Sequence, residues 1–446
     1  MITIFNTLTG KKEQFASQNP QAVSMYVCGI TPYDYAHIGH GRVYVTFDVL
    51  FRLLTFLGYK VSYCRNFTDI DDKIIARAQK ELNDEHKFLE IPKKYIAAYT
   101  QDMDRLNCLQ PNYQPCVTDH MSEIIDFIQG LVDAGKAYVA DGDVYFSIKQ
   151  FAEYGKLSKR NLDDLQVGAR VEVNPKKKNP LDFVLWKGES EGGVAWDSPW
   201  GKGRPGWHIE CSALAKRYFG NTIDIHAGGL DLIFPHHENE IAQSEGLHKK
   251  QFANYWMHNG FVQVNKEKMS KSLDNFFTLR DVFTQFDPMV VRFYLLSHHY
   301  KAPLDFSFDD IVACQKSYQK LCRVFDDANC DVNQNPSQIM QSEIVNKMLN
   351  FLGDDLNTPG MWGVVFENIS IINQDATQRC QIKAFIHQVI GLPVAPLPEK
   401  EQVMTPEIQQ LLQEREQARA AKDWEKSDTI RDKLVQLGWN IQDKKI

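Results

Sequence analysis

The chain has 446 residues, of which 43% are hydrophobic and 24% charged, and its formal net charge is -7. These values are ordinary for a globular protein, and the length exceeds what one hydrophobic core supports, so several domains are expected. The small negative charge gives no overall signal for nucleic-acid binding, because that affinity depends largely on Lys and Arg meeting phosphates. An RNA partner therefore has to be argued from local features.

The nine cysteines are scattered along the chain, and none forms a Cys-x-x-Cys pair. This pattern disfavours the disulfide framework of a small secreted domain and favours a reducing compartment. The N-terminus reaches Lys11 and Lys12 without the apolar stretch of a signal peptide, and no segment is long and apolar enough to span a membrane. We therefore expect a cytoplasmic protein without a membrane partner.

Apolar periodicity predicts the first elements of the chain. Alternation over 23–28 predicts a strand, the spacing over 47–57 predicts a helix, and 61–67 is expected to form the next strand. This order of elements is typical of a parallel nucleotide-binding sheet. The strand pattern resumes at 223–226 and again at 261–264, and each run is short enough to be a buried strand.

The segment between these two groups of strands has a different character. Helical periodicity over 92–106 and 119–134 is followed by short strand and turn signals, which indicates an insertion that splits the sheet domain. After about residue 308 the pattern is mostly helical, with interruptions at 333–337 and 392–406. A helical domain and a small C-terminal module are therefore expected.

The sequence His37-Ile38-Gly39-His40 stands where the first predicted strand gives way to the helix. Backbone N–H groups and the helix dipole at such a junction favour a phosphate, and Gly39 would let a base or sugar approach the backbone. The two imidazoles add hydrogen-bond donors. The alternative is a capped helix with two surface histidines, and four residues alone do not decide between them.

Residues 268–272 read Lys-Met-Ser-Lys-Ser and follow a predicted strand. Such a run is usually a solvated surface loop, although its ammonium and hydroxyl groups also suit a polyphosphate. Together and in this order, the two motifs resemble the signatures of class I aminoacyl-tRNA synthetases. The resemblance implies that His37, His40, Lys268 and Lys271 are catalytic. His37, Gly39 and His40 would bind ATP, and Lys271 would stabilise charge at the α-phosphate.

The sequence Gly228-Gly229-Leu230-Asp231 lies between the two motifs. The same resemblance implies that Gly229 and Asp231 hold the ATP ribose. Leu230 is a departure, because a small polar residue is common at this position in the cysteine branch of the family. Mg²⁺ is implied together with ATP.

A candidate metal site begins at Pro235. His236 and Glu240 would share one face of a helix, and His237 with Glu240 is a rival pair that geometry leaves open. An acidic first turn that interacts with the helix dipole is the plain alternative. Cys28 and Cys211 could add two thiolates, which would complete a zinc-binding set, although most lone cysteines are small core residues.

Four longer stretches resemble cysteinyl-tRNA synthetases, and the similarity extends over essentially the whole chain. The stretches are 26–31, 66–73, 206–212 and 235–240. One departure is Pro32, where many members carry valine; it removes no proposed ligand. The resemblance implies a zinc ion held by Cys28, Cys211, His236 and Glu240, which favours His236 over His237. It also places Thr68, Trp207 and His226 around the substrate cysteine, although each of these three could equally be an ordinary core or hydrogen-bonded residue.

The implied fold is α/β, with the Rossmann-like parallel-sheet catalytic domain of class I synthetases. The implied activity is ATP-dependent activation of L-cysteine and its transfer to tRNA(Cys) by a monomeric chain. One zinc ion would recognise the substrate thiol, because a soft thiolate is a better zinc ligand than the hydroxyl of serine. The predicted divisions are the first half of the catalytic domain at 1–118, an insertion at 119–205, the second catalytic half at 206–307, a helical bundle at 308–395 and an anticodon-binding module at 396–446.

Basic residues and one tryptophan, Trp424, mark the final helical segment. Such a segment could contact an anticodon, although the interspersed acidic residues fit a solvated amphipathic helix equally well. Resemblance to the anticodon-binding module of the family favours the first interpretation. The basic residues are Arg415, Arg419, Lys422, Lys426, Arg431 and Lys433.

Two other functions fit parts of this pattern. A ligase that joins adenylated cysteine to a small-molecule amine, as in mycothiol synthesis, would share the ATP and zinc sites and differ in the RNA-binding regions. A zinc-stabilised nucleic-acid-binding module without catalysis would make the paired ATP motifs a coincidence. ATP–pyrophosphate exchange that depends on cysteine would exclude this second alternative.

Overall fold

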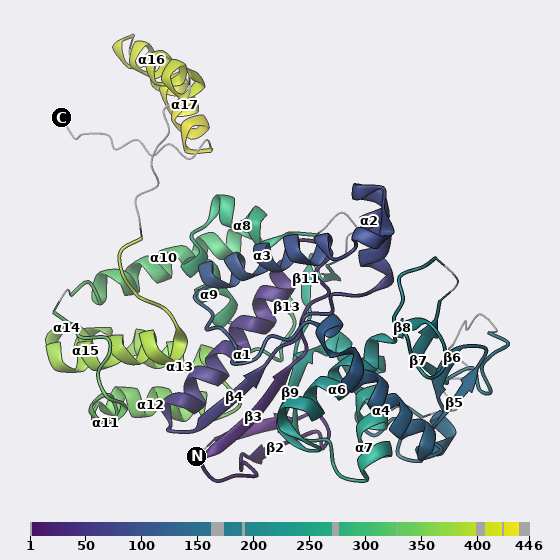
Figure 1. Cartoon of the computed structure of the whole chain (residues 1–446). Helices are drawn as coiled ribbons and strands as arrows, with labels where there is room; N and C mark the ends of the chain where they lie inside the picture. Colours follow the sequence, from purple (N-terminus) through teal and green to yellow (C-terminus); the bar gives the residue numbers. More distant parts are fainter. Residues whose placement is uncertain are drawn as a thin grey trace. The chain divides into compact units, whose positions relative to one another are not determined.

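The computed structural model describes residues 2–161, 174–189, 192–269, 276–327, 329–397, 406–421 and 423–436. The chain divides into two compact units, Met1–Ala395 and Pro396–Ile446. Figure 1 labels the helices and strands of both units. The five-part division proposed from the sequence is finer than this one and stays a prediction.

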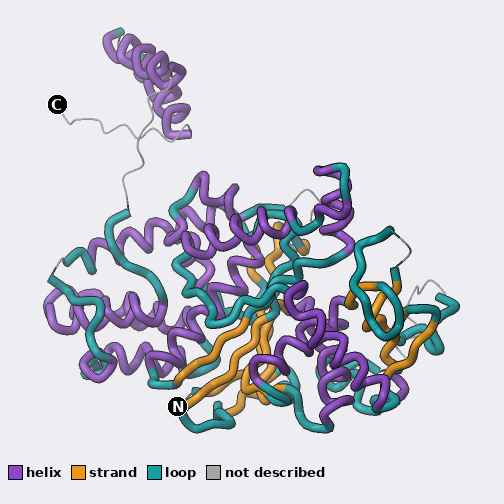
Figure 2. The backbone as a smooth tube through the Cα atoms, in the orientation of Figure 1, coloured by secondary structure: helices purple, strands orange, loops and turns teal. Residues whose placement is uncertain are grey.

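A four-stranded parallel sheet forms the centre of the larger unit (Figure 2). Its strands stand in the order β10 (Ala253–Asn259), β9 (Ile223–Gly229), β3 (Ala22–Val27) and β4 (Lys60–Cys64). Because β3 pairs with both β4 and β9, strands that are far apart in the sequence lie side by side. The parallel sheet predicted from the sequence is confirmed.

One row of paired residues crosses this sheet near its carboxyl edge. Tyr26 pairs with Cys64 on one side and with His226 on the other. His226 pairs in turn with Trp256, and their rings stack with centroids 4.5 Å apart. Tyr26 and Cys28, which follows β3, belong to one buried hydrophobic cluster.

Helices cover both faces of the sheet (Figure 1). On one face, α1 (Ile38–Phe56) has fourteen of its nineteen residues buried, because it also packs against α9 (Pro288–Leu296). On the other face, α4 (Met121–Asp133), α6 (Trp207–Phe219) and α7 (Glu238–His248) pack against one another. Coverage of both faces explains why the strands are buried over most of their length.

The prediction that 261–264 continues the parallel sheet is wrong. There β11 (Val262–Val264) pairs with β12 (Glu267–Lys268) and β13 (Leu304–Asp305) in a separate three-stranded sheet. The strand that the sequence analysis missed is β10, whose sequence Ala-Asn-Tyr-Trp-Met-His-Asn mixes polar and apolar residues. Its polar residues at 258 and 259 are buried in hydrogen bonds, so polarity was a misleading signal here.

An antiparallel sheet lies within the segment predicted to be an insertion. Its four strands follow one another in sequence order as β5 (Ala137–Ala140), β6 (Asp143–Phe146), β7 (Phe183–Gly188) and β8 (Gly203–Pro205). The last of them is separated from α6 by a single glycine. This segment therefore leads directly into α6 and then β9 of the parallel sheet. The remaining elements before it are β1 (Thr3–Asn6), β2 (Lys11–Gln14), α2 (Asp72–Leu82) and α3 (Glu90–Arg105).

The chain is mostly helical beyond residue 308, as predicted. A disulfide joins Cys330 to Cys380 there, with Cα atoms 4.9 Å apart, and the sequence analysis did not predict this pair. Within the described residues, the helices are each too short or too polar to cross a bilayer. The helices of this part and of the segment leading to it are α8 (Leu279–Gln285), α10 (Phe308–Val324), α11 (Pro336–Ile339), α12 (Glu343–Leu352), α13 (Thr358–Glu367), α14 (Ile369–Gln374) and α15 (Ala376–Phe385).

Within its described residues, the smaller unit contains two helices, α16 (Pro406–Ala420) and α17 (Trp424–Gln436). They pack through a small core that includes Ile408, Ile430 and Leu434.

Two arginines pair with the buried carboxylate of Asp48, a residue of α1. Asp48 accepts hydrogen bonds from Arg52, at 2.8 Å, and from Arg292 of α9. Arg292 is fully buried and also donates to the backbone carbonyls of Leu106 and Ile390, each at 2.8 Å. This residue therefore joins α1, the end of α3 and the last helical turn before residue 391.

We predict that Arg292→Met lowers the free energy of unfolding of the larger unit by about 3 kcal/mol, because it leaves two buried carbonyls unpaired and removes one partner of Asp48. Urea denaturation checks this. Lys12→Met is the control, since Lys12 and Asp354 form an exposed ion pair and its loss should cost less than about 0.5 kcal/mol. Equal effects of the two substitutions would contradict the prediction.

Candidate active site

A cavity of about 610 Å³ opens at the carboxyl ends of the parallel strands. It is lined by the residues that follow β3, by the first turn of α1, and by the residues that end β9 and β10. In open parallel sheets, ligands bind at this edge, where the strand order reverses. Here the reversal falls at β3, which lies between β4 and β9.

The first turn of α1 is built by two histidines. The Nδ1 atom of His37 accepts the backbone N–H of His40, and Nδ1 of His40 accepts the backbone N–H of His37, each at 3.3 Å. Their rings stack with centroids 3.6 Å apart. Because each Nδ1 accepts a hydrogen bond, the neutral rings carry their protons on Nε2, which is then a donor. Both predicted ATP-site histidines line the cavity.

The predicted glycines and Asp231 also line this cavity. A side chain at Gly39 would come within 2.9 Å of the His37 ring. A Cβ at Gly229 would lie 2.5 Å from Oδ1 of Asp231. The absence of a side chain at both positions therefore keeps the cavity wall open beside groups that can donate or accept hydrogen bonds.

The Lys-Met-Ser-Lys-Ser motif is described only at its edges. The backbone of Lys268 belongs to β12, whereas Lys271 lies outside the described residues. Met269 and Phe276, on either side of the undescribed stretch, both line the cavity. Phe276 contacts the ring of His37 edge to face at 5.2 Å. The two signature motifs thus flank the same cavity.

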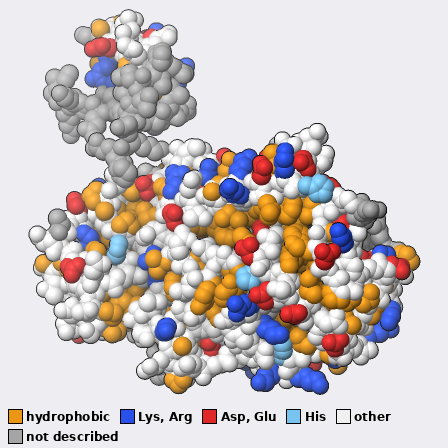
Figure 3. Space-filling model, in the orientation of Figure 1, with side chains coloured by type: hydrophobic (Ala, Val, Ile, Leu, Met, Phe, Trp, Pro, Cys, Tyr) orange, Lys and Arg blue, Asp and Glu red, His pale blue; other side chains and the backbone are white. Residues whose placement is uncertain are grey.

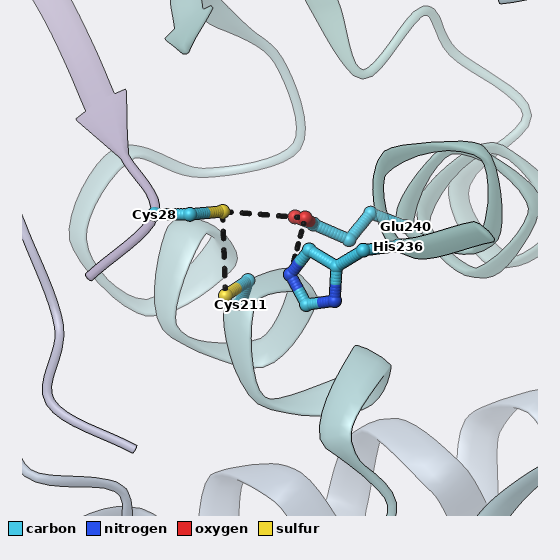
Figure 4. Close-up of side chains that lie close together, drawn as sticks. All are labelled: Cys28, Cys211, His236 and Glu240. Carbon is cyan, nitrogen blue, oxygen red and sulfur yellow. Dashed lines mark hydrogen bonds and ion pairs between the residues drawn. The ribbon is translucent and has the colours of Figure 1, made fainter. Parts of the chain in front are cut away.

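Four predicted metal ligands converge from separate elements (Figure 4). Cys28 follows β3, Cys211 lies in α6, His236 precedes α7 and Glu240 lies in its first turn. One donor atom of each lies within 4.8 Å of every other, and all four residues are buried. Cys28 also lines the cavity, so this cluster lies at its wall.

The spacing of the four donors can be compared with a tetrahedral zinc site. Bonds of about 2.3 Å to sulfur and about 2.1 Å to oxygen or nitrogen would separate two sulfurs by about 3.8 Å, sulfur and oxygen by about 3.6 Å, and nitrogen and oxygen by about 3.4 Å. The observed separations are 3.8 Å from Cys28 to Cys211, 3.6 Å from Cys28 to Glu240, and 3.1 Å from His236 to Glu240. The donor set and its spacing fit zinc.

A second set of four shares Cys28 and Glu240 but contains His226 and His237. His237 lies 3.3 Å from the Cys28 sulfur and 3.9 Å from Glu240. Its other ring nitrogen is 2.8 Å from His258. This set offers one sulfur instead of two, and zinc binds thiolate strongly, so the set with Cys211 and His236 is the better fit.

Several residues that the sequence analysis did not single out surround these donors. His208 approaches His236, with 2.9 Å between their Nδ1 atoms, and Asn66 approaches the Cys211 sulfur at 3.8 Å. Such outer hydrogen bonds orient metal ligands. Asn66 and His208 both belong to stretches on which the family resemblance was based. His258 carried no signal because its strand, β10, was missed.

The four donors interact electrostatically, and the pKa values of neighbouring donors are shifted in opposite directions. Burial raises the pKa of the Cys28 thiol well above its usual value, whereas a hydrogen bond from Cys28 lowers the pKa of Cys211 to about 6. Burial disfavours protonation of His236, but Glu240 and Cys211 outweigh it and raise the pKa to about 10. Burial likewise raises the pKa of Glu240, and the nearby His226 and His236 reverse this and lower it to about 2.

The three residues predicted to surround the substrate cysteine occupy different places. Trp207 is 42% exposed and lines the cavity. Its ring is tilted against the His236 ring, with centroids 4.3 Å apart. Thr68 is buried and donates to Glu210 at 2.7 Å. His226 is buried and lies 2.8 Å from Glu240. Trp207 can therefore meet a ligand directly, whereas the other two lie behind the cavity wall, and their predicted role stays a prediction.

Comparison with known proteins agrees with this geometry. The family model for the class I (C) tRNA synthetase catalytic domain matches residues 14–316, and the model for the cysteinyl-tRNA ligase anticodon-binding domain matches 401–445. The chain is 45% identical to cysteine–tRNA ligase of Pelobacter propionicus over 99% of this chain and 98% of that protein. It belongs to the cysteine–tRNA ligase family. The corresponding protein of Mannheimia succiniciproducens is also 45% identical, over 99% of this chain and 98% of its own length.

Solved structures show that this member of the cysteine–tRNA ligase family has the class I synthetase fold, as predicted. Methionyl-tRNA synthetase of Mycobacterium tuberculosis, in complex with methionyl-adenylate, aligns with a TM-score of 0.58 and 13% identity over 83% of this chain and 92% of that one. LeuRS of Agrobacterium radiobacter, in a ternary complex with tRNA and LeuAMS, gives 0.58 and 11% over 85% of each chain. At these identities the likeness concerns the fold alone.

We predict that zinc binding to the metal-stripped protein releases about two protons at pH 7, one from Cys28 and one from His236, because both are protonated before binding and ligate only when deprotonated. Cys211 and Glu240 are already ionised at this pH. Titration calorimetry in two buffers of different ionisation enthalpy gives the count. The same titration without protein is the control, and binding without proton release would contradict the assignment.

Proposed function

We propose that this chain is a cysteine–tRNA ligase that activates L-cysteine with ATP and transfers it to tRNA(Cys). The proposal rests on the observation that the zinc-type donor set and the start of α1 adjoin the same cavity. Cys28, which belongs to the zinc-type donor set, lines the same cavity as His37 and His40 at the start of α1. A thiol-recognising centre is therefore within reach of a nucleotide-binding helix terminus.

Activation of cysteine requires mainly positioning and stabilisation of charge. The carboxylate of the amino acid is already a nucleophile, so no protein base is needed to attack the α-phosphate. The Nε2–H groups of His37 and His40 and the N-terminus of α1 would bind phosphate oxygens. Gly229 and Asp231 would hold the ribose. Lys268 and Lys271 would add charge as pyrophosphate leaves, and Mg²⁺ would accompany ATP.

The zinc ligands are proposed to be Cys28, Cys211, His236 and Glu240. When bound, zinc supplies a Lewis acid that prefers the thiolate of cysteine to the hydroxyl of serine. The protein side chains fix this preference by orientation: His226 holds Glu240, and Trp207 covers His236 on the cavity side. Because zinc would bind the sulfur of substrate cysteine directly, serine would be rejected at this site, and a separate editing site is unnecessary.

Transfer to RNA is supported by the smaller unit. Trp424 is 59% exposed at the start of α17, and Lys426 and Lys433 are exposed on the same helix. An aromatic ring among cations suits an unpaired base. Arg415 is buried, so it is a core residue and not part of this surface, and Lys422 lies outside the described residues.

The net charge of the chain gives no sign of an RNA partner, so the RNA proposal depends on local features. On the face of the larger unit shown in Figure 3, acidic and basic side chains are interspersed and do not form fields of one sign. The match of residues 401–445 to an anticodon-binding domain supports an RNA substrate over a small-molecule amine. The monomeric state and the cytoplasmic location stay predictions.

We predict that Cys211→Ser removes zinc from the protein, because it takes one of the two sulfurs from the proposed site. His237→Asn should retain about one zinc per chain, because it belongs only to the rival set. Metal content after dialysis is measured by mass spectrometry on both variants. Loss of zinc from the His237 variant with retention in the Cys211 variant would reverse the assignment.

We predict that truncation after Ala395, at the boundary between the two units, preserves cysteine-dependent ATP–pyrophosphate exchange and reduces tRNA charging. All proposed zinc, nucleotide and cysteine residues precede this point. The affinity for tRNA should fall, and its salt dependence should become shallower, because phosphate contacts are lost. Both assays use one preparation whose folding is first verified by circular dichroism.

Three results would change the proposal. If the intact protein activates cysteine but charges no tRNA, the amine-ligase alternative is favoured. If the truncated protein charges tRNA as well as the intact one, the RNA-binding role of residues 396–446 is wrong. If the intact protein shows no cysteine-dependent exchange, the proposed activity is wrong.

A further inference from the structure

A buried carboxylate links the proposed zinc ligands to the insertion. Glu238 begins α7 and lies between His236 and Glu240 in sequence. It is fully buried. Its side chain has no part in the cluster of metal donors and instead contacts a loop at 155–158, which follows the β5–β6 hairpin.

Three backbone N–H groups of this loop donate to the carboxylate. Oε1 of Glu238 accepts from Gly155 at 2.9 Å and from Leu157 at 3.4 Å, and Oε2 accepts from Ser158 at 2.7 Å. Hydrogen bonds to an ionised acceptor are among the strong ones, and a buried donor left without its partner is costly. The carboxylate therefore fixes the first turn of α7 against the loop.

The curvature of the loop depends on Gly155. Its φ is +96°, a conformation that side-chain-bearing residues rarely adopt, and a Cβ there would lie 2.1 Å from the carbonyl oxygen of Arg160. The loop can close around the carboxylate only because this position is glycine. A change at Gly155 would thus disturb the contact from the side of the insertion without touching α7.

Other contacts extend this attachment along α7. The hydroxyl of Tyr154 donates to Asn239 at 2.5 Å, and the ammonium group of Lys156 pairs with Glu245. The loop is therefore held at two further positions of the same helix. Of these contacts, the one at Glu238 lies two residues from each of the proposed ligands His236 and Glu240.

We propose that Glu238 is a positioning residue that makes the geometry of the zinc centre depend on the placement of the insertion. His236 and Glu240 lie in or next to the first turn of α7, and Glu238 fixes the rotation and height of that turn. Metal ligands must be held within about 0.5 Å of the productive geometry, so a looser turn weakens the site. The inference rests on the proposed zinc-dependent recognition of cysteine.

The first test is Glu238→Gln in the full-length protein. Glutamine has the same size, but its NH₂ group cannot accept an N–H, so at least one loop donor loses its partner. We expect the zinc dissociation constant to rise about tenfold, the lower end of the range for outer hydrogen-bond partners of metal ligands. The preference for cysteine over serine, measured as the ratio of kcat/KM values in pyrophosphate exchange, should fall.

The matched control is Glu245→Gln, the same substitution on the same helix, which removes the contact with Lys156 farther from the ligands. Gly155→Ala is a second variant, which disturbs the loop and leaves every residue of α7 unchanged. Zinc affinity is measured by competition with a chromogenic chelator, alongside melting temperatures of the zinc-loaded proteins. Glu238→Gln and Gly155→Ala should weaken zinc binding, and Glu245→Gln should not.

The outcomes separate this inference from the proposed function. A wild-type protein that binds no zinc would overturn both. If the wild type binds zinc and folded Glu238→Gln or Gly155→Ala binds it equally well with unchanged preference for cysteine, only the inference is wrong. Equal weakening in all three variants would also overturn it, because general loosening of α7 would then be sufficient. If Glu238→Gln does not fold, Gly155→Ala decides.

Discussion

The carboxylate of Glu240 is the interaction on which the arrangement of the site depends. It lies 2.8 Å from His226 of β9, 3.1 Å from His236 and 3.6 Å from the Cys28 sulfur beyond β3. One ionised group therefore joins the central strands of the sheet to the helix beside them. A buried charge is costly unless it is paired in this way, so the surrounding imidazoles and thiols are a requirement of the fold as well as candidates for function.

The two signature motifs depend on the same sheet. The first turn of α1 follows β3, and the strand β11, which leads to the second motif, follows β10. Because β3 and β10 are both neighbours of β9, the first motif and Met269 of the second reach the cavity from opposite sides of one strand. This arrangement explains how residues so far apart in the sequence can line one cavity.

The sequence predicted the local features better than the pairing of distant ones. The elements at β3, α1, α3 and α4 follow directly from apolar periodicity, and the resemblance to a family located the four zinc-type donors before their distances were known. The strand β10 was missed because His258 and Asn259 look like loop residues until the buried groups that bind them are known. The contacts of Glu238 and the Cys330–Cys380 pair were likewise hidden, because nothing in the sequence places one loop against one helix.

The strand order also has a consequence for synthesis of the protein. Strands β3 and β4 leave the ribosome early, but the neighbour that covers the open edge of β3 is β9, which is made only after the whole insertion. Until then the unpaired edge of β3 is available to other chains. Neither proposed site can form in the nascent chain before α7 and β10 have emerged, so the antiparallel sheet of β5 to β8 is synthesised while the parallel sheet is still incomplete.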